Sequence, residues 1–545
     1  MPIITFDYKD LIKLLRKEID KKELIDKLPM MGVSIERIEN NEISIEVFPN
    51  RPDMLCIEGI ARALRAFLGI EKGLKKYEIS PPKISLYVEN DLEKIRPYIA
   101  GAIIRNIEID DKTIKSLMES QEKLHFSLGK DRKKMAIGVH DFDKVKPPFY
   151  YKAVAPNEIK FVPLGKDEEM DLDEILKKHE KGIAYAHLLR NFEKYPIIID
   201  KEGNVLSFPP IINGILTAIN EETKNIFIEV TGIDIKAVLS SLVIISTALA
   251  ERGGKLEQIE VIGKEEKSFV PNLTPRLNIV KIDYIKKLLK IEKIEDIIEA
   301  IKRMGHDAEI VGNEIKVYSP AWRVDILHPI DIIEDIAIGY GYENFPKIMP
   351  YSMTFGSSLS FEKLHQTMIG LGFNEVVTLS LSSYEKEFIK MEIKGNPVEI
   401  KNPISSEHTI IRQSLLPSLL EILNKNRHNE LPQKIYEIGD IAFYNGKVTQ
   451  KKMLAGVKID VKANFTECKS IVEAILRNFG LKLDVKEGKH NSFIEGRFAI
   501  IVAENEEIGY FGELKPSVIR NFDLEYPVIG FEIDIMKLFS LSKQN

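Results

Sequence analysis

The stretch PAWRVDILHPIDIIEDIAIGYGYENFP, residues 320–346, is the most informative part of this sequence for the fold. It predicts an acidic helix in which Asp331, Glu334 and Asp335 are spaced i, i+3 and i+4 and therefore share one face. Asp325 lies upstream of Pro329, and we expect the chain to fold back there over the start of the helix. Four carboxylates would then converge on one point.

The acidic stretch has two chemical interpretations. Converging carboxylates repel each other, and a hard divalent cation such as Mg²⁺ relieves that cost because it prefers oxygen ligands. Alternatively, the carboxylates form a solvated helix face with favourable charges near the helix N-terminus. A metal-dependent nuclease or phosphatase is disfavoured, because it would add a cationic or imidazole group at the phosphate. Only Arg323 and His328 lie near by in the sequence.

Working outward from this stretch, the chain divides into four blocks. Residues 267–350 predict a strand, two helices, a strand and the acidic helix, as in a small winged-helix-like or split α/β module. Residues 1–79 predict a small α/β domain, and residues 80–263 a strand-rich, mixed α/β domain. Residues 351–545 predict antiparallel strand pairs with few helices. The expected fold class is a multidomain α+β protein.

The run NIFIEVTGID, residues 225–234, predicts a strand with two different faces. Glu229 and Thr231 point to one side, and Ile226, Ile228 and Val230 point to the other. A strand that is apolar on one face and has Glu and Thr on the other is suited to the wall of a polar pocket. An ordinary half-exposed strand remains the alternative.

Two further candidates lie in GKDRKKMAIGVHDFD, residues 129–143. His140, next to Asp141, has the chemistry of a general base, although a neutral histidine in the core or on the surface is equally compatible. Arg132 belongs to the basic run KDRKK. Such a run is usually a solvated face, but it also suits contact with the phosphates of an RNA.

Composition excludes several classes of protein. The formal net charge is -6, so the chain is not a uniformly basic nucleic-acid-binding protein. Cys56 and Cys468 lie far apart, which excludes a CxxC metal site and a disulfide framework. The sequence has no P-loop or GxGxxG motif. It also lacks an N-terminal signal core and any apolar stretch of about 18 residues, so we expect a cytoplasmic protein without membrane contact.

Four runs of this sequence resemble the phenylalanyl-tRNA synthetase β subunits of the archaeal and eukaryotic type. They are RVDILHPIDIIEDIAIGYGY at residues 323–342, PNRPDMLCIEGIARAL at residues 49–64, FPPIING at residues 208–214 and NIFIEVTGID at residues 225–234. The order of the blocks also matches that family, and the resemblance covers nearly the whole chain. It implies an editing domain at 80–263, a magnesium-binding module at 267–350 and a degenerate class II synthetase-like sheet domain at 351–545.

The resemblance implies a role for each candidate residue. Asp325, Asp331, Glu334 and Asp335 would bind Mg²⁺ at the contact with an α subunit. Glu229 would recognise the hydroxyl of a mischarged tyrosine, with Thr231 and Asp234 lining the same pocket. The loop that contains Asn213 and Thr217 would approach the bound aminoacyl-adenosine. Arg132 would contact the acceptor end of tRNA, and His140 remains a candidate base.

The resemblance also implies how the work is divided between subunits. A separate α subunit would use ATP to attach phenylalanine to tRNA(Phe) within an α2β2 heterotetramer, and this chain would hydrolyse tyrosyl-tRNA(Phe). Residues 351–545 lack the ATP-clamping arginine that class II catalysis needs, since Arg412 does not lie in such a motif. The apolar run SLLPSLLEIL, residues 414–423, fits either a subunit contact or the core of its own domain. A free-standing tRNA-binding or editing protein is the alternative function.

Overall fold

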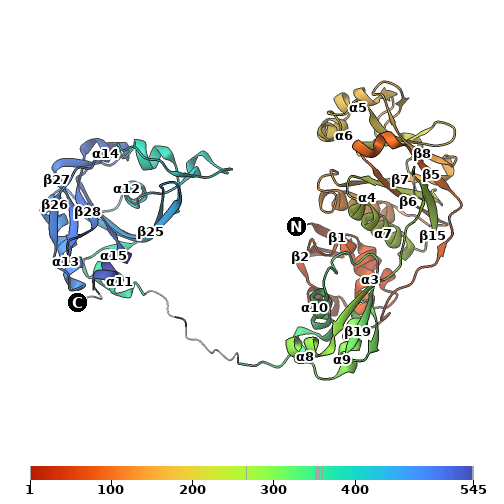
Figure 1. Ribbon diagram of the computed structural model, residues 1–545, viewed down its shortest axis with the longest axis horizontal. Coiled ribbons are helices and arrows are strands. Elements are labelled where there is room, and N and C mark those ends of the chain that lie inside the picture. The colour runs from red at the N-terminus through yellow and green to blue at the C-terminus, as the bar shows by residue number, and fades with distance from the viewer. Residues whose placement is uncertain (1, 265–266, 350–355, 357–359, 543–545) are drawn as a thin grey trace. The chain divides into compact units, whose positions relative to one another are not determined.

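The computed structural model describes residues 2–264, 267–349, 356 and 360–542. The chain divides into two compact units, Met1–Met349 and Pro350–Asn545 (Figure 1). Both units combine helices with sheets, so the expected multidomain α+β class is confirmed.

The N-terminal part of the first unit is a small antiparallel sheet with the strand order β1-β3-β2. Its apolar residues alternate along β3, where Ile43, Ile45 and Val47 are all buried. The elements are β1 (Ile3–Asp7), α1 (Tyr8–Leu15), α2 (Lys21–Lys27), β2 (Val33–Glu39), β3 (Glu42–Val47) and α3 (Ile57–Phe67).

A sheet of 11 strands forms the centre of the first unit. Its main path is β13-β12-β11-β8-β5-β15-β6-β14-β7, and β4 and β16 both pair with β15. The strands are β4 (Ile79–Ser80), β5 (Ser85–Val88), β6 (Tyr98–Arg105), β7 (Met135–Asp141), β8 (Phe149–Val154), β11 (Tyr195–Ile199), β12 (Val205–Phe208), β13 (Ile212–Asn213), β14 (Ile226–Gly232), β15 (Lys255–Ile262) and β16 (Lys267–Val270). The longer helices around the sheet are α4 (Asp111–Phe126), α5 (Leu172–Lys178), α6 (Glu180–Tyr185) and α7 (Ile235–Glu251).

The two ends of this sheet lie against each other. The end strands β13 and β7 are in contact, and the Asn213 side-chain amide donates a hydrogen bond to the carbonyl oxygen of Val139 at 3.3 Å. The sheet therefore curls until its first and last strands nearly meet. Helix α7 packs on β6 and β14, and α4 packs on β7 beside this junction (Figure 1).

The N-terminal part and the large sheet share one hydrophobic core, although we expected separate domains with a boundary near residue 79. Arg252, just after α7, forms two 2.8 Å bonds to the carboxylate of Asp10 and a 2.6 Å bond to Glu58. Residues 267–270, which we expected to open the third block, form β16 and pair with β15 of the large sheet instead.

The third block is a small layered module with the predicted strand, two helices, strand and acidic helix, and it has one further strand, β18, between the second helix and the predicted second strand. A three-stranded antiparallel sheet, β17-β19-β18, packs with three helices around a cluster of buried isoleucines. Its elements are β17 (Arg276–Lys281), α8 (Ile282–Leu289), α9 (Ile294–Arg303), β18 (Asp307–Val311), β19 (Glu314–Ser319) and α10 (Pro329–Tyr340). Helix α10 contains the acidic stretch and packs against α9.

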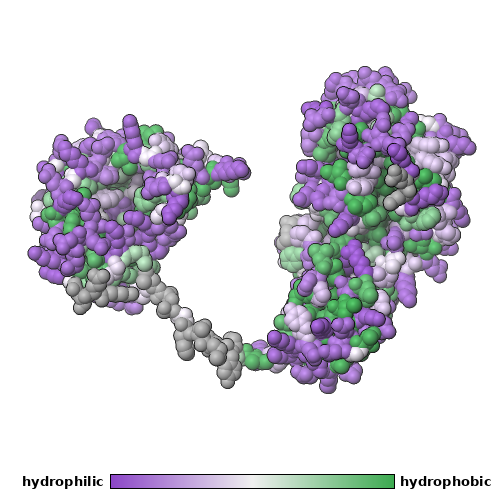
Figure 2. All heavy atoms as spheres, viewed as in Figure 1, coloured by the Kyte–Doolittle hydropathy of each residue, from purple (hydrophilic) through white to green (hydrophobic). Residues whose placement is uncertain are grey.

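The second unit is built on a seven-stranded sheet with the order β20-β24-β25-β29-β28-β27-β26. All of its neighbouring strands are antiparallel except β20 and β24. Figure 2 shows mostly hydrophilic residues on the visible face of this unit. The main elements are α11 (Glu362–Gly370), β20 (Asn374–Glu375), α12 (Leu416–Lys425), β24 (Gln433–Tyr444), β25 (Val448–Ile459), α13 (Phe465–Asn478), β26 (Asp484–Glu487), β27 (Phe493–Ala503), β28 (Glu506–Leu514), α14 (Pro516–Asn521), β29 (Val528–Asp534) and α15 (Ile535–Ser542).

Helix α12 decides between the two interpretations of the run 414–423. Leu416, Leu419, Leu420 and Leu423 are all at most 1% exposed and belong to one hydrophobic cluster of the second unit. The apolar face of α12 is therefore occupied by the core of its own unit.

Candidate functional site

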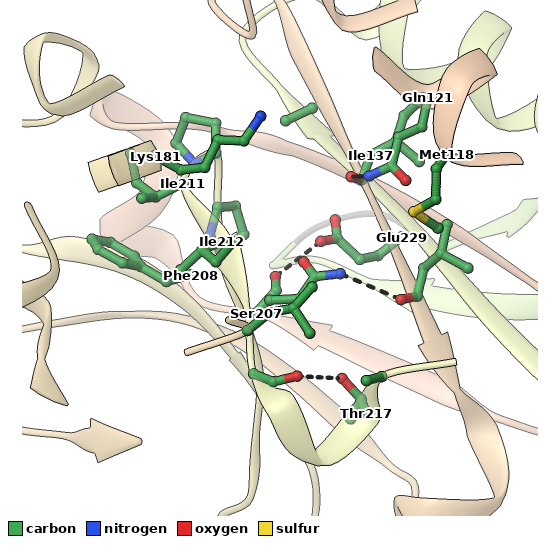
Figure 3. A pocket seen from close by; sticks show the side chains of 18 of the residues that line it. Met118, Gln121, Ile137, Lys181, Ser207, Phe208, Ile211, Ile212, Thr217 and Glu229 are labelled. Atoms are coloured by element: carbon green, nitrogen blue, oxygen red, sulfur yellow. Dashed lines mark hydrogen bonds between the residues drawn. The ribbon is translucent and has the colours of Figure 1, made fainter. Parts of the chain in front are cut away.

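A cavity of about 300 Å³ lies where the ends of the large sheet meet (Figure 3). It is bounded by the edge strand β7, by helix α4 and by the segment 207–219. The free edge of β7 is covered by side chains: the Gln121 amide donates to the carbonyl of Ile137 at 2.6 Å, and His125 Nε2 accepts from the amide of Ile137 at 2.8 Å. The cavity therefore lies beside an edge of the sheet whose backbone groups at Ile137 are already hydrogen-bonded.

The cavity is largely apolar with a few polar groups inside it. Met118, Ile137, Phe208, Ile211 and Ile212 contribute apolar wall, and the polar lining includes Gln121, Ser207, Asn213, Thr217 and Glu229. An apolar cavity with a few fixed polar groups is typical of sites that bind small molecules or single side chains.

Glu229 is the most unusual of these polar groups. It is only 2% exposed, and its Oε1 accepts a 2.9 Å hydrogen bond from the hydroxyl of Ser207. Its Oε2 is buried and has no hydrogen-bond partner. A buried carboxylate oxygen without a donor is costly, and a ligand that supplies a hydroxyl to it would remove that cost.

His140 lies behind the cavity, fully buried on β7. Its Nδ1 is 2.8 Å from the Thr217 hydroxyl, and its Nε2 lies 3.9 Å from Glu229 Oε1 and has no hydrogen-bond partner. His140 is absent from the cavity lining, so it contacts a ligand only through Thr217 or Glu229. Its position is that of a supporting residue and not of an exposed general base.

Arg132 lines the cavity, but it does not lie on a solvated basic face. It is 6% exposed, and its guanidinium donates to the carbonyls of Pro210 and Ile211 at 3.2 and 2.9 Å and to the Glu122 carboxylate at 2.7 Å. The interpretation of Arg132 as part of a solvated basic face is therefore wrong, and its contact with the acceptor end of tRNA stays a prediction. Its role here is to hold the loop at 209–211 against α4.

The structure does not bring Thr231 and Asp234 to the cavity. Thr231 is fully buried and accepts a 3.0 Å hydrogen bond from the guanidinium of Arg96, whose pKa burial lowers to about 10. Asp234 caps the N-terminus of α7 and pairs with Lys134 at 2.7 Å. The expectation that both residues line the Glu229 pocket is therefore wrong, and strand geometry explains why for Thr231. Two residues along a strand move the side chain about 7 Å, which is enough to leave a small cavity.

Ser207 and Gln121 belong to the site but are absent from the sequence-based candidates. Ser207 immediately precedes the run FPPIING and faces Glu229 from β12. Gln121 comes from α4, whose sequence has no distinguishing motif. The sequence offered one signal for Ser207, its position directly before the run FPPIING, and none for Gln121.

Two carboxylates of the acidic stretch, Asp325 and Asp335, are paired with Arg323. Asp335 is 4% exposed, accepts a 2.6 Å hydrogen bond from Arg323 and lies 2.7 Å from His306 Nε2. Burial opposes ionisation of Asp335, but the charge of Arg323 outweighs it and lowers the pKa of the carboxyl to about 2. Arg323 also forms a bidentate pair with Asp325 at 2.9 and 2.8 Å.

The remaining two carboxylates do not join this network. Asp331 accepts 2.7 Å hydrogen bonds from the amides of Leu327 and His328 at the helix N-terminus, and Glu334 is exposed. In the described part of the chain, no group of three or more His, Cys, Asp or Glu side chains is placed to hold a metal ion. Asp325, Asp331, Glu334 and Asp335 therefore do not converge on one point as we expected, because Arg323 pairs with Asp325 and Asp335 while Asp331 caps the helix. These residues do not fit a magnesium ion on their own.

In the second unit, Arg412 is a structural residue. It is 2% exposed and pairs with Glu437 at 2.8 Å, and it donates to the Thr378 hydroxyl at 2.7 Å and to the carbonyl of Asp440 at 2.9 Å. A guanidinium with these partners is not available to hold a triphosphate. Among the described residues of both units, none of the helices combines the length and apolarity needed to cross a membrane.

Four family models match successive parts of the chain. Residues 1–70 match the B1 domain of the Phe-tRNA synthetase beta subunit, and residues 96–253 match the B3/4 domain. Residues 279–342 match the tRNA synthetase B5 domain, and residues 345–535 match the CLM domain of the phenylalanyl tRNA synthetase beta chain.

Curated relatives and a solved structure agree with these matches. The phenylalanine–tRNA ligase beta subunits of Methanocaldococcus jannaschii and Methanosarcina barkeri are 48% and 46% identical to this chain, covering 98% and 99% of it and 100% of each relative. The crystal structure of an N-terminal fragment of the phenylalanyl-tRNA synthetase beta subunit from Pyrococcus horikoshii is 41% identical and has a TM-score of 0.61. It covers 62% of this chain and 99% of the fragment. Full-length similarity at this level means that the chain belongs to the family of phenylalanyl-tRNA synthetase β subunits.

Proposed function

We propose that this chain combines two tasks, supporting the ligation of phenylalanine to tRNA(Phe) by a separate α subunit and hydrolysing tyrosyl-tRNA(Phe) at the cavity beside Glu229. The observation on which the second task depends is the unpartnered Oε2 of Glu229, buried in a largely apolar cavity. A phenol ring has the matching chemistry, since its ring is apolar and its hydroxyl donates one hydrogen bond.

The need for a second site follows from the limits of the first. A pocket shaped for phenylalanine rejects tyrosine only weakly, by roughly 10²-fold, because an apolar pocket cannot strongly exclude an added hydroxyl. The Glu229 cavity has the opposite preference. A tyrosyl hydroxyl satisfies Oε2, whereas a phenylalanine side chain would leave it without a donor, and leaving a buried polar group unpaired is the stronger penalty.

His140, the candidate base, does not line the cavity. The polar groups that line it beside Glu229 are the amides of Gln121 and Asn213, the hydroxyls of Ser207 and Thr217, and the charged side chains of Glu122, Arg132 and Lys181. Arg132 and Lys181 both pair with Glu122. We assign hydrolysis to a water molecule that these groups orient at the aminoacyl ester. The side chain of the amino acid enters the cavity, and the rest of the tRNA remains outside.

The second unit is assigned a noncatalytic, class II synthetase-like role. Its antiparallel sheet suits that architecture, and the partners of Arg412 exclude that residue from ATP binding. ATP would be used at the active site of the α subunit, in an α2β2 assembly with tRNA(Phe) as the shared substrate. Any magnesium at the acidic helix would take most of its ligands from that partner, because only Glu334 of the four carboxylates is exposed.

The alternative is a free-standing tRNA-binding or editing protein. Co-purification distinguishes this alternative from the main proposal. A β subunit of the synthetase retains its α subunit through purification, and a free-standing protein does not.

Glu229→Ala in the αβ complex tests the editing assignment. We expect hydrolysis of tyrosyl-tRNA(Phe) to fall roughly 10- to 100-fold, the value of a hydrogen bond to a charged group, while charging with phenylalanine stays unchanged. Deacylation of purified tyrosyl-tRNA(Phe) and of phenylalanyl-tRNA(Phe) is the measurement.

Glu257→Ala is the matched control. Glu257 lies on β15 of the same sheet, is 3% exposed and pairs with Arg105 at 3.0 and 3.1 Å, but it does not line the cavity. It should leave the tyrosyl-tRNA deacylation rate unchanged. Equal deacylation by the Glu229→Ala and wild-type complexes would refute the assignment.

A further inference from the structure

Glu229 reaches the cavity from a strand that does not border it. The cavity lies at the free edge of β7, and Glu229 belongs to β14, one strand further into the sheet. Its side chain must therefore pass over β7 to place its carboxylate in the cavity. The residue directly opposite Glu229 on β7 is Gly138.

Gly138 supplies the space that this path requires. A Cβ atom built on Gly138 would lie 2.3 Å from Glu229 Oε1, 2.9 Å from Glu229 Cδ and 2.8 Å from His140 Nε2. Carbon atoms do not approach other heavy atoms this closely, so the carboxylate occupies the volume that any other side chain at position 138 would fill. The backbone of Gly138 is that of an ordinary strand, with no positive φ, so the need for glycine here is a need for space and not for conformation.

Ser207 holds the same carboxylate from the opposite side. It lies on β12, is 1% exposed and donates its 2.9 Å hydrogen bond to Oε1, the oxygen that lies over Gly138. The other oxygen, Oε2, is left without a partner. One carboxylate oxygen is thus fixed between two elements at the two ends of the sheet, and the second is free for a ligand.

We propose that Gly138 and Ser207 are positioning residues that determine the specificity of the cavity, because together they place the Glu229 carboxylate where it can receive a phenolic hydroxyl. The inference rests on the proposed function of the cavity. A side chain at position 138 would push the carboxylate out of its path over β7, and the cavity would then lose its preference for a hydroxylated ring.

Gly138→Ala in the αβ complex is the test. We expect the KM for tyrosyl-tRNA(Phe) in deacylation to rise and kcat/KM to fall roughly 10- to 100-fold, as for loss of the Glu229 contact itself. The ratio of tyrosyl- to phenylalanyl-tRNA deacylation should fall with it. Ser207→Ala should lower the same ratio by a smaller factor, since it frees Oε1 without displacing the carboxylate.

Gly101→Ala is the matched control, because Gly101 faces Glu229 from the other neighbouring strand, β6. A Cβ there would meet Ile259 Cδ1 at 2.7 Å and Phe227 Cε2 and the carbonyl of Ile228 at 3.0 Å, and none of the closest atoms belongs to Glu229. This variant adds a side chain with similarly short contacts at the position that pairs with Glu229 on the other side of β14. It should lower stability while leaving the deacylation ratio at the wild-type value.

Two double variants separate positioning from general damage. If Gly138 acts through Glu229, Gly138→Ala adds no further loss of tyrosyl-tRNA deacylation in a Glu229→Ala background, whereas independent effects would multiply. Combining Gly138→Ala with Glu229→Asp, which shortens the displaced side chain, should restore part of the lost activity. Multiplying effects, or a Gly138→Ala ratio equal to that of wild type or of Gly101→Ala, would overturn the inference.

A stability measurement makes the inference independent of the proposed function. Gly138→Ala should destabilise the first unit of the wild-type chain, and most of that loss should disappear in the Glu229→Ala background, where no carboxylate is left to displace. The fluorescence of Trp322, the one tryptophan of the sequence, reports this unfolding. If the wild-type complex fails to deacylate tyrosyl-tRNA, the proposed function is refuted, but the positioning of Glu229 by Gly138 is not. If Gly138→Ala lowers stability as much in the Glu229→Ala background as in the wild-type chain, the role of Gly138 is refuted.

Discussion

Glu229 and Asp335 are both buried carboxylates of the first unit, but their surroundings differ in one respect. Asp335 lies between Arg323 and His306, and the positive charge of Arg323 balances its own. Glu229 receives one hydrogen bond from the neutral hydroxyl of Ser207, and its second oxygen has no partner beside a cavity. A carboxylate whose charge and hydrogen bonds are satisfied internally holds the fold together, whereas one that is left incomplete beside a cavity is available to a ligand.

The comparison changes the assignment that the sequence favours for the acidic helix. In the sequence the four acidic residues 325–335 form the denser carboxylate cluster, and Glu229 is a single acid among apolar residues. In the structure the cluster is divided among an arginine, a histidine and two backbone amides, and the single acid keeps one oxygen without a hydrogen-bond partner beside a cavity.

Arg323→Ala is expected to have the largest effect on this comparison. It would leave Asp335 buried with only His306 as a partner, and breaking a buried ion pair from one side costs about 3–5 kcal/mol. Denaturant unfolding followed by the fluorescence of Trp322, which lies next to Arg323 in the sequence, measures the loss in the first unit.

Two controls bracket that value. Arg37→Ala removes an exposed ion pair with Glu39 and should change stability by about 0–1 kcal/mol. Glu229→Gln removes the charge of the cavity carboxylate, which forms no ion pair with a lysine or arginine among the described residues, and should stay within about 1 kcal/mol of wild type. If Arg323→Ala costs no more than Arg37→Ala, the network at Asp335 does not hold the fold.

Acidification should have the next largest effect. The pKa of Asp335 is about 2 in the folded chain against an ordinary value of 3.8, so its ionised form stabilises the fold above pH 3.8. That contribution, about 2 kcal/mol, is lost as the pH falls from about 3.8 through 2. The difference in unfolding free energy between wild type and Asp335→Asn, measured by Trp322 fluorescence, should therefore narrow over this window. A difference that is constant from pH 5 to pH 2 would contradict the charge pairing.

Magnesium should have the smallest effect. Because Arg323 occupies the centre of the acidic network, millimolar MgCl₂ should stabilise the purified chain by less than about 0.5 kcal/mol. The same titration with Glu334→Gln tests the one exposed carboxylate of the set. Stoichiometric magnesium binding by the chain alone in isothermal titration calorimetry would show that the Arg323 network opens to admit a metal.

The sequence predicted much of the architecture because local patterns specify local elements. The helices of the small module, the strand at residues 433–444 and the strand containing Glu229 all follow from periodicity, whereas the residues of β18 were expected to continue the preceding helix. Glu229, Asn213, Thr217 and Arg132 were identified as candidates and do line the cavity. Thr231 and Asp234 were grouped with them because they are adjacent in sequence, and in the fold they serve Arg96 and the N-terminus of α7.

The sequence alone therefore determined the family, the element types and the acid on which the proposed editing activity depends, since each is expressed in a run of neighbouring residues. Only the tertiary structure decided which carboxylates are paired and which is free, because pairing depends on residues far apart in the chain. Arg323 pairs with Asp335, and His306 contacts the same carboxylate from another element. Ser207 on β12 and Gly138 on β7 both lie next to the Glu229 carboxylate, although β12 and β7 are far apart in the strand order of the large sheet.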